Sequence, residues 1–240
     1  MIKSLFLYMF RDYLRSYKYI VPILLFIVFL LGIYVDQPVD VLGSYIITSI
    51  FVYFISAWLA LGFLDTEDNV QQQLTILHSG NQSIYYLCKI VFVWVITLLL
   101  SLIAVVYPIL IHAFMRPIDS TDLLLGFLSH VTLGLLGTSI GCLFNTRLIR
   151  DRRLALLGLY LVIIISIIQG TLISAVPFLK YIIYLLPPVY FTMNNISTAS
   201  NLKPIDLSSN IDILLYFGII FLYLIALIFI FIKLMKKKAF

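Results

Sequence analysis

The sequence predicts an all-α membrane protein with six transmembrane helices. Of its 240 residues, 62% are hydrophobic and only 11% are charged, whereas a soluble domain carries about 25% charged residues. This much apolar surface does not fit into one soluble core, so the bilayer must act as the solvent. The apolar residues also form long runs, and basic residues gather at the ends of those runs.

Six apolar runs are candidates for spans, since a spanning helix needs about 20 mostly apolar residues. Uniformly apolar runs predict helices, because the strands of a membrane barrel alternate in polarity. The first run is short, but its helix can begin in the preceding N-terminal segment. The predicted spans are Tyr19–Val35, Val41–Leu64, Ile90–Phe114, Leu123–Phe144, Leu154–Val176 and Ile213–Ile232. With no soluble domain and no internal repeat, residues 1–240 are expected to form one membrane domain.

Residues 1–18, before the first predicted span, combine an apolar and a basic helical face. The apolar face is formed by Leu5, Met9, Tyr13 and Tyr17, and the basic face by Arg11, Arg15 and Lys18. This pattern predicts an amphipathic helix in the membrane interface that leads into the first span. A frayed basic tail is the alternative.

Lysine and arginine indicate the orientation, because cytoplasmic loops carry an excess of both. With both termini in the cytoplasm, 13 of the 16 basic residues lie inside, and only Arg116, Lys180 and Lys203 lie outside. The sequence therefore predicts a multi-pass protein of the plasma membrane with both termini cytoplasmic. The net charge of +5 does not indicate nucleic-acid binding, because no basic stripe with interleaved aromatic residues occurs outside the spans.

Residues 65–89, DTEDNVQQQLTILHSGNQSIYYLCK, form a strongly polar segment between the second and third predicted spans. Thr66 or Asp68 can cap a helix that begins there, and acidic residues suit its first turn through the helix dipole. Gly80 can end this helix, and Ser83 can then cap a second helix that runs into the third span. The segment is predicted to be cytoplasmic.

One face of this predicted cytoplasmic helix is an apolar ridge formed by Val70, Leu74 and Leu77 at spacing i, i+4, i+7. Glutamines, among them Gln73, form a hydrogen-bonding surface beside the ridge. A short amphipathic helix of this kind suits a groove on another protein. The alternative is a helix lying flat on the membrane, which the acidic residues and the lack of a basic face disfavour.

Two segments on the outer side are not predicted to span. Residues 177–191, PFLKYIIYLLPPVYF, are apolar but too short to cross, and Pro187 and Pro188 interrupt them. They predict a re-entrant hairpin that dips in from the outer face. The polar stretch that follows, residues 194–212, is expected to be a plain extracellular loop.

The sequence lacks the motifs of nucleotide hydrolysis and metal chemistry. A phosphate-binding loop ends in Gly-Lys-Ser/Thr, and none of the 11 glycines precedes a lysine. The histidines show no metal-ligand spacing, and His112 and His130 are expected at headgroup depth. Cys88 and Cys142 are expected to behave as small apolar residues. We therefore expect a chain that is not an enzyme and binds no cofactor itself.

The span interiors contain almost no ionisable residue, although such residues mark ion or proton paths. This argues against proton or sodium coupling and against an embedded hydrolase. The polar residues proposed to line a cargo path are Thr48, Ser49, Ser56 and Gln169. Walls of hydroxyls and aromatic rings suit a hydrophobic or amphipathic cargo.

Two further features concern helix packing. Gly137 and Gly141 form a GxxxG motif in the fourth span, and small residues let helix backbones approach closely. We expect this face to pack within the subunit rather than between subunits. Pro108 is expected to kink the third span.

The overall pattern resembles the permease subunits of type-2, ABCG-like ABC exporters. It combines six spans, cytoplasmic termini, an N-terminal amphipathic helix, an acidic helical loop after span two and a broken hairpin before the last span. In that family the loop typically reads E-x-G-T-x-E-x-L-L, followed by a Pro and then a Lys that opens span three. Asp68 matches the leading acid, Leu74 a ridge leucine and Lys89 the closing lysine.

The same loop also departs from the family pattern. Val70 and Gln71 replace Gly-Thr, Gln73 stands where the second Glu usually is, and Ser79 or Gly80 replaces the Pro. These departures concern individual contacts rather than the docking role. The resemblance implies a coupling helix seated in a cleft of a separate ATP-binding subunit. The residues assigned to this coupling are Asp68, Val70, Gln73, Leu74, Leu77 and Lys89.

The resemblance also implies an assembly of two permeases, either two copies or two paralogues, with two ATP-binding subunits that hold ATP and Mg. The loop NTRLIRDRR between spans four and five would make a second cytoplasmic contact. Its basic residues are Arg147, Arg150, Arg152 and Arg153. The alternative for this loop is a plain positive-inside anchor.

The sequence thus predicts the membrane subunit of an ATP-driven exporter for a hydrophobic or amphipathic cargo. Such cargo includes a bacteriocin-like or other membrane-active peptide, a lipid-like molecule or a hydrophobic drug. A stand-alone immunity protein that sequesters a toxin at the membrane is the alternative. An integral-membrane enzyme is disfavoured, because the acids at 65–68 face no partner motif.

Overall fold

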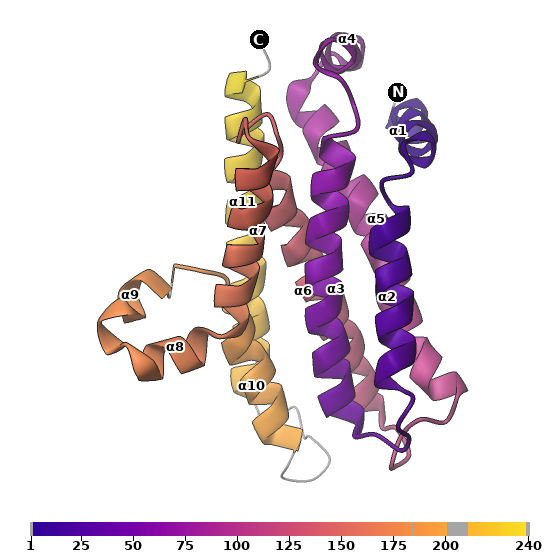
Figure 1. The fold of residues 1–240 in the computed structure, drawn as a ribbon, viewed down its shortest axis with the longest axis vertical. Coiled ribbons are helices and arrows are strands. Elements are labelled where there is room, and N and C mark those ends of the chain that lie inside the picture. The colour runs from indigo at the N-terminus through magenta and orange to yellow at the C-terminus, as the bar shows by residue number, and fades with distance from the viewer. Residues whose placement is uncertain (1, 184, 201–210, 239–240) are drawn as a thin grey trace.

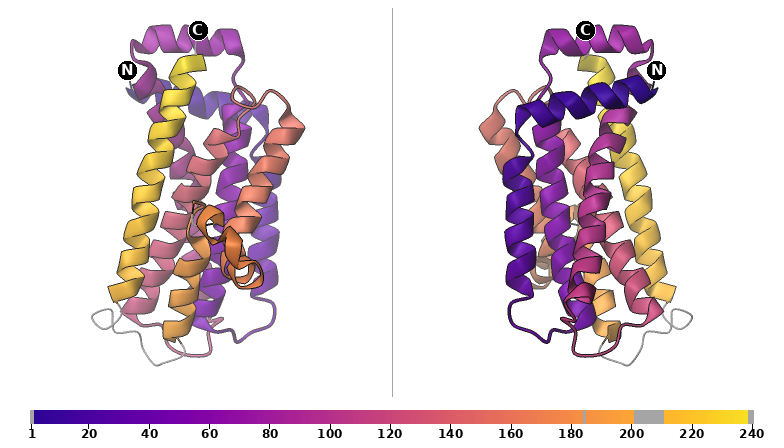
Figure 2. Two further views of the ribbon diagram at one scale, coloured as in Figure 1. Left: turned by 90° about the vertical axis from the view of Figure 1, so that its left-hand side faces the viewer. Right: turned by 90° about the vertical axis from the view of Figure 1, so that its right-hand side faces the viewer.

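The computed structural model describes residues 2–183, 185–200 and 211–238, and every named element in these ranges is a helix (Figure 1). Most of the helices run side by side along the long axis of the molecule. Two helices lie across one end of this bundle, and a short hairpin projects from its side (Figures 1 and 2).

Four helices are long and apolar enough to cross a membrane: α3 (Val41–Leu64), α5 (Gln82–Leu110), α6 (Ser120–Leu143) and α11 (Ile211–Lys238). At about 1.5 Å per residue, each exceeds the roughly 30 Å hydrocarbon core of a bilayer. They confirm the helices predicted for the second, third, fourth and sixth spans. α3 and α6 lie at the centre, whereas much of α11 exposes apolar side chains.

The boundaries of α5 differ from those predicted for the third span. The helix begins at Gln82 and so includes the segment before Ile90, where a helix running into the third span is expected. The side chain of Asn81 accepts hydrogen bonds from the backbone N–H groups of Ser83 and Ile84. Asn81 is therefore the cap, and the expected cap at Ser83 is wrong. α5 ends at Leu110 instead of Phe114, so Pro108 lies in its last turn.

The fifth predicted span is a bent pair of helices, and the helix of the first predicted span meets the interfacial helix before it at a similar bend. α1 (Ile2–Ser16) meets α2 (Ile20–Ile33) at 79°, and α7 (Arg152–Ile167) meets α8 (Gln169–Ala175) at 75°. α2 therefore does not continue an N-terminal helix, and a continuous helix over residues 154–176 is wrong. With these pairs counted as single spans, the chain has up to six candidate membrane spans.

The bend between α7 and α8 is stabilised by contacts with the chain that returns after it. Gln169 is buried there, and its Nε2 donates to the backbone carbonyls of Ile183 and Leu186 at 3.0 and 3.3 Å. Gly170 faces the ring of Tyr190 so closely that a Cβ at this position would overlap it. The returning chain therefore holds α8 away from the axis of α7.

A short hairpin follows this bend and projects sideways from the bundle (Figure 1). It contains α8, a 3₁₀ turn (Pro177–Leu179) and α9 (Lys180–Ile183), and α10 (Val189–Ser200) then packs on α3 and α11. The predicted hairpin is present in outline, and its depth in a membrane stays a prediction. The loop expected over 194–212 is helical up to Ser200, and residues 201–210 lie outside the described residues.

α1 is the amphipathic helix that the sequence predicts. Leu5, Met9 and Tyr13 are buried on one face, and Arg11 and Arg15 are exposed. The helix lies across the end of the bundle, nearly at right angles to the spans (Figure 2). Tyr17 lies beyond its last turn with φ 55° and is exposed, so it does not belong to the buried face.

The closest helix packing joins α3 to α6. A Cβ at Gly137 would meet Ser56 Oγ and the carbonyl oxygen of Tyr53, and one at Gly141 would meet the carbonyl oxygen of Ala57. The predicted packing role of the GxxxG motif within the subunit is therefore confirmed. Only glycine allows the two backbones this separation.

We expect Gly141→Ala to lower the free energy of unfolding by about 1–3 kcal/mol, because the added methyl group overpacks the interface. Gly218→Ala in α11 is the matched control, because a Cβ there meets nothing within 4 Å. Thermal unfolding in detergent, followed by tryptophan fluorescence, measures the difference. Equal unfolding midpoints for the two variants would contradict the close approach of α3 and α6.

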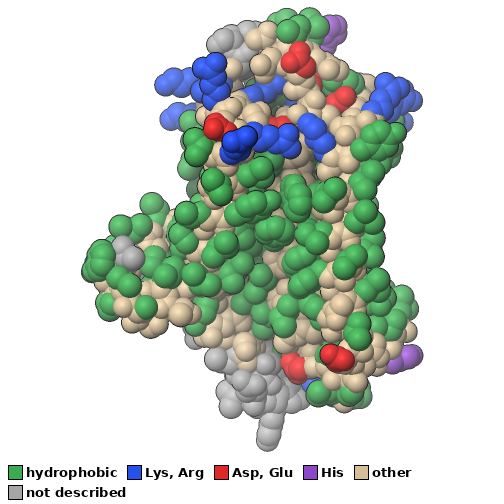
Figure 3. Space-filling model, in the orientation of Figure 1, with side chains coloured by type: hydrophobic (Ala, Val, Ile, Leu, Met, Phe, Trp, Pro, Cys, Tyr) green, Lys and Arg blue, Asp and Glu red, His purple; other side chains and the backbone are tan. Residues whose placement is uncertain are grey.

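Both ends of the described chain and α4 (Asn69–Ser79) lie at the same end of the bundle (Figures 1 and 2). Lysine and arginine side chains gather at this end, directly beyond a belt of hydrophobic surface (Figure 3). We call it the basic end. At the opposite end, Arg116 forms a bidentate pair with Asp122, with N···O distances of 2.6 and 2.9 Å.

Candidate functional site

α4 is the central element of the candidate site and lies across the basic end of the bundle (Figure 2). Asp68 occupies its N-cap position with an extended backbone but makes no capping hydrogen bond through its side chain. Gly80 ends the helix in the left-handed conformation, with φ 65°, as the sequence predicts. The chain then turns directly into α5.

The two long faces of α4 differ in exposure. Gln72, Ile76 and Ser79 are buried against the bundle. The opposite face carries the predicted apolar ridge, where Val70, Leu74 and Leu77 are 64%, 53% and 65% exposed. The ridge therefore points away from the protein rather than into its core. Gln73 and Asp68 are exposed beside it.

Glu67 connects α4 to the rest of the molecule. Its side chain is buried, and Oε2 lies 2.7 Å from the ammonium group of Lys89 and also accepts a hydrogen bond from the Tyr85 hydroxyl, both on α5. Oε1 accepts hydrogen bonds from Tyr8 on α1 at 3.1 Å and from Thr75 on α4 at 3.0 Å. One carboxylate thus joins three helices. We call Glu67 and its four partners, Lys89, Tyr85, Tyr8 and Thr75, the Glu67 cluster.

Glutamines of α4 add two direct links to its neighbours. Gln71 Nε2 donates to the hydroxyl of Tyr8 at 2.6 Å, and Gln72 Nε2 donates to the hydroxyl of Tyr86 at 2.9 Å. The first link joins α4 to α1, and the second joins α4 to α5. α4 is therefore fixed to the bundle along its inner face, while the ridge on its outer face is exposed.

Lys89 occupies a different place from the one that the sequence suggests. It lies two turns inside α5, is 2% exposed, and pairs with Glu67. Its Nζ also lies 4.9 Å from the centre of the Tyr85 ring. Lys89 therefore does not reach the outer face of α4, and it acts on that face only through the Glu67 cluster.

The loop between α6 and α7 contacts the segment before α4. Thr146 donates through its backbone N–H and its hydroxyl to Asp65 Oδ1, at 2.9 and 2.7 Å. Arg147 Nη2 donates to the backbone carbonyls of Glu67 and Asp68, at 3.2 and 3.3 Å. Of the four predicted arginines, Arg147 is brought to the site, whereas those at 150, 152 and 153 are exposed along the loop and the start of α7.

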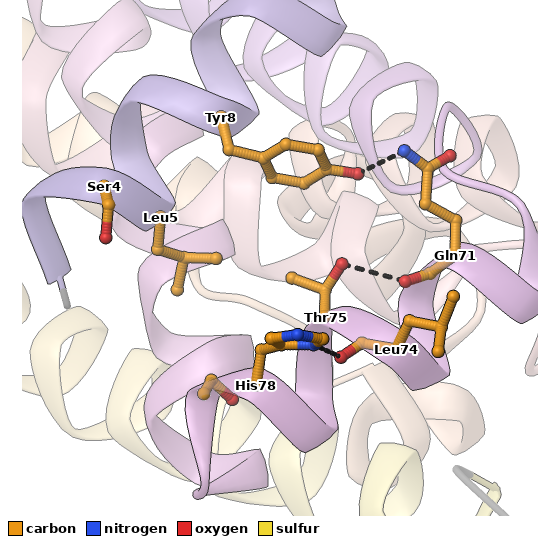
Figure 4. A pocket seen from close by; sticks show the side chains of 8 residues that line it. Ser4, Leu5, Tyr8, Gln71, Leu74, Thr75 and His78 are labelled. Carbon is orange, nitrogen blue, oxygen red and sulfur yellow. Dashed lines mark hydrogen bonds between the residues drawn. The ribbon is translucent and has the colours of Figure 1, made fainter.

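A groove of about 300 Å³ separates α1 from α4 beside the ridge. Figure 4 shows the side chains of Leu5 and Leu74 on its walls, with Tyr8, Gln71 and His78 around them. The groove and the ridge share Leu74. Together they form one partly apolar surface at the basic end, which we call the α4 surface.

Electrostatics favour an ionised Glu67. Burial alone would raise the pKa of its carboxyl group, but the Lys89 ammonium and the hydrogen bonds from Tyr85 and Thr75 outweigh burial and hold the pKa below its ordinary value of 4.5. Burial and the negative charge of Glu67 raise the pKa of Asp12 on α1. The two carboxyl groups therefore shift in opposite directions, and the fold favours the ionised form of Glu67.

This pKa shift predicts a pH dependence. Because the folded pKa of Glu67 lies below the unfolded value, its contribution to stability is present above about pH 4.5 and is lost as the pH falls through the folded pKa. We expect the thermal midpoint of the wild type to fall more steeply in acid than that of Glu67→Gln. Parallel pH profiles of the two proteins would contradict the ionised pairing.

The residues predicted to line a cargo path are buried inside the chain. Ser49 and Ser56 on α3 donate to carbonyl groups of their own helix, and Thr48 Oγ1 lies 2.9 Å from Nε2 of His130. Gln169 stabilises the α7–α8 bend. The structure does not bring Gln169 together with the three α3 residues in one cavity, and their role in a cargo path stays a prediction.

One expectation about a polar group changes. His130 is fully buried between α3 and α6, and its Nδ1 lies 2.6 Å from the carbonyl oxygen of Gly126, so it is not at an outer interface. His112 is exposed in the loop after α5. Among residues 2–183, 185–200 and 211–238, no group of three or more His, Cys, Asp or Glu could hold a metal ion.

Sequence reasoning missed Glu67, Tyr8 and Tyr85 as members of the site. The available signal was Lys89, which is followed directly by a long apolar run. If the helix begins before Lys89, the lysine lies inside the apolar bundle and requires a counter-ion. The three acidic residues at 65–68 are the only nearby candidates in the sequence. Their spacing alone does not say which of them points inward.

The site is therefore an exposed apolar ridge on a helix that a buried ion pair fixes to the bundle. The ridge is exposed, and within the described ranges no group of residues could hold a metal ion. No protein-family model, curated protein or solved structure matches this chain.

Proposed function

We propose that this chain is the membrane-spanning subunit of an ATP-driven exporter, powered by a separate ATP-binding subunit that docks on the α4 surface. The observation that carries the proposal is the exposed ridge of Val70, Leu74 and Leu77 on a helix fixed across the basic end. Apolar anchors at i, i+4 and i+7 suit a hydrophobic groove on a partner protein.

The Glu67 cluster supports a mechanical role for α4. A docking helix transmits the movement of a partner only if it is firmly joined to the elements that must move. Glu67 joins α4 to α1 and α5, and Arg147 joins the same segment to the loop before α7. Closure of two ATP-binding subunits would therefore displace α4, α5 and α7 together.

The orientation and the cargo belong to the same proposal. The excess of lysine and arginine at the basic end favours a cytoplasmic location for the termini and α4, where ATP is present. The membrane-facing surface is apolar, and the polar groups of α3 are turned inward. Such a subunit suits a hydrophobic or amphipathic cargo such as a membrane-active peptide, and it would pair with a second copy or a paralogue.

Affinity purification of the tagged chain from its native membranes in mild detergent tests this proposal. We expect a co-purifying protein whose sequence contains a Gly-Lys-Ser/Thr phosphate loop, together with ATPase activity in the eluate. A chain that elutes without an ATP-binding protein would overturn the proposal and favour a stand-alone protein that sequesters a toxin.

A further inference from the structure

A groove between α2, α3 and α7 begins at the basic end and continues into the hydrophobic belt. Its upper part, with a volume of about 270 Å³, lies beside Lys18 and Arg152 and is lined below them by Trp58, Leu156 and Tyr160. Lys18 lies just before α2, and Arg152 is the first residue of α7. Two cations from opposite walls therefore meet at the mouth of an apolar groove.

Neither of these two cations has an acidic side chain within salt-bridge distance in the described ranges. Lys18 Nζ donates to the backbone carbonyl of Asp65 at 2.6 Å. Burial lowers the pKa of Lys18, the negative charges of Asp65 and Asp12 oppose this lowering in part, and the neighbouring Arg152 guanidinium adds to it. An anion at the mouth of the groove would relieve the repulsion between them.

The apolar part of the groove is long enough for more than a headgroup. Phe54 stacks on Tyr160 with ring centroids 5.5 Å apart and contacts Trp58 edge-on. A separate groove of about 340 Å³ is lined by Phe29, Phe54 and Ile164. An amphiphile could therefore place its charge at the basic end and its chain along α3.

We propose that this groove binds an anionic phospholipid of the leaflet at the basic end, with the phosphate between Lys18 and Arg152 and one acyl chain along Trp58 and Phe54. Basic pockets between membrane helices bind anionic headgroups. Free phosphate would not use the apolar wall, and the choline cation of phosphatidylcholine would stand beside Lys18 and Arg152, so a headgroup with a net negative charge is favoured. This inference does not depend on an ATP-binding partner and goes beyond the proposed function.

Tryptophan fluorescence offers a direct test, because the chain has two tryptophans and only Trp58 lines the groove. Trp94→Phe leaves Trp58 as the only reporter, and Trp94 Nε1 makes no hydrogen bond that the change would remove. The protein is reconstituted into vesicles of phosphatidylcholine and phosphatidylglycerol. Bromine on the acyl chains of one lipid or the other quenches a tryptophan in contact with that lipid.

We expect brominated phosphatidylglycerol to quench Trp58 more strongly than brominated phosphatidylcholine at the same mole fraction. Lys18→Gln and Arg152→Gln should each lower this preference about fivefold, as expected for about 1 kcal/mol per cation at the membrane surface. Arg153→Gln is the matched control, since its side chain is exposed beside Arg152 but does not line the groove. It should keep the preference.

Several outcomes would overturn the inference. Equal quenching by the two brominated lipids, or a preference that persists in the Lys18→Gln/Arg152→Gln double variant, would remove the headgroup site. Quenching by neither lipid would mean that protein, such as a second copy, covers the groove. Loss of the preference on addition of inorganic phosphate would assign the cations to a free anion. The thermal midpoint of each variant establishes that it is folded.

Discussion

Lys89→Met is expected to destabilise the protein strongly and to release α4 from the bundle. The change leaves the carboxylate of Glu67 buried without its cation, and breaking a buried ion pair in this way costs about 3–5 kcal/mol. We expect a lower midpoint of thermal unfolding in detergent and faster hydrogen exchange over Asn69–Ser79 than in the wild type. The backbone amides of α4 report the release directly.

Two further variants separate the ion pair from general damage to the core. The double variant Glu67→Gln/Lys89→Met removes both charges, so its loss of stability should be smaller than the sum of the two single losses. Asp68→Asn changes the exposed acid next to Glu67 and should leave the midpoint unchanged. If Lys89→Met unfolded within about 1 kcal/mol of the wild type, the Glu67 cluster would not be what fixes α4.

Leu74→Glu is expected to abolish binding of the ATP-binding subunit and export while leaving the membrane fold intact. Leu74 is more than half exposed and contributes to both the ridge and the groove, so a charge there is tolerated by the free chain. In a docked complex the same charge would be buried without a partner, which costs several kcal/mol. Such a cost lowers the affinity by at least about a hundredfold.

Leu74→Met is the matched control for this prediction, because it keeps an apolar side chain of similar size. It should retain the co-purified ATPase, whereas Leu74→Glu and Leu77→Glu should lose it. All three variants should keep the wild-type unfolding midpoint and the same yield in the membrane fraction. Undiminished ATPase co-purification with Leu74→Glu would remove the ridge from the docking surface.

Much of the fold was predictable because long periodic patterns dominate it. The four straight spans follow from uninterrupted apolar runs, and the ridge of α4 follows from the spacing of Val70, Leu74 and Leu77. The approach of α6 to α3 through Gly137 was also visible as a motif. These features depend on local sequence, and long, strongly periodic segments are the ones that such reasoning predicts most reliably.

The bends were not predictable from local patterns. The helix after Ile167 is redirected by carbonyl groups of Ile183 and Leu186, which lie far along the chain, while residues 154–176 read as one apolar run. The Glu67–Lys89 pair was missed for a related reason. A helix that runs from Ser83 into the third span includes Lys89, but nothing in its local pattern shows that Lys89 packs against Glu67 in the preceding segment.

Cysteine cross-linking at Leu74 tests the central claim most directly. Cys88 and Cys142 are buried, so a Leu74→Cys variant presents one exposed thiol within the described residues. A thiol-reactive photo-cross-linker at this position in native membranes should yield an adduct with a protein that contains a Gly-Lys-Ser/Thr loop. The control is Val35→Cys, which is exposed just after the last residue of α2, away from the basic end, and should yield no such adduct. Cross-linking of Leu74→Cys to lipid alone would contradict a docked ATP-binding subunit.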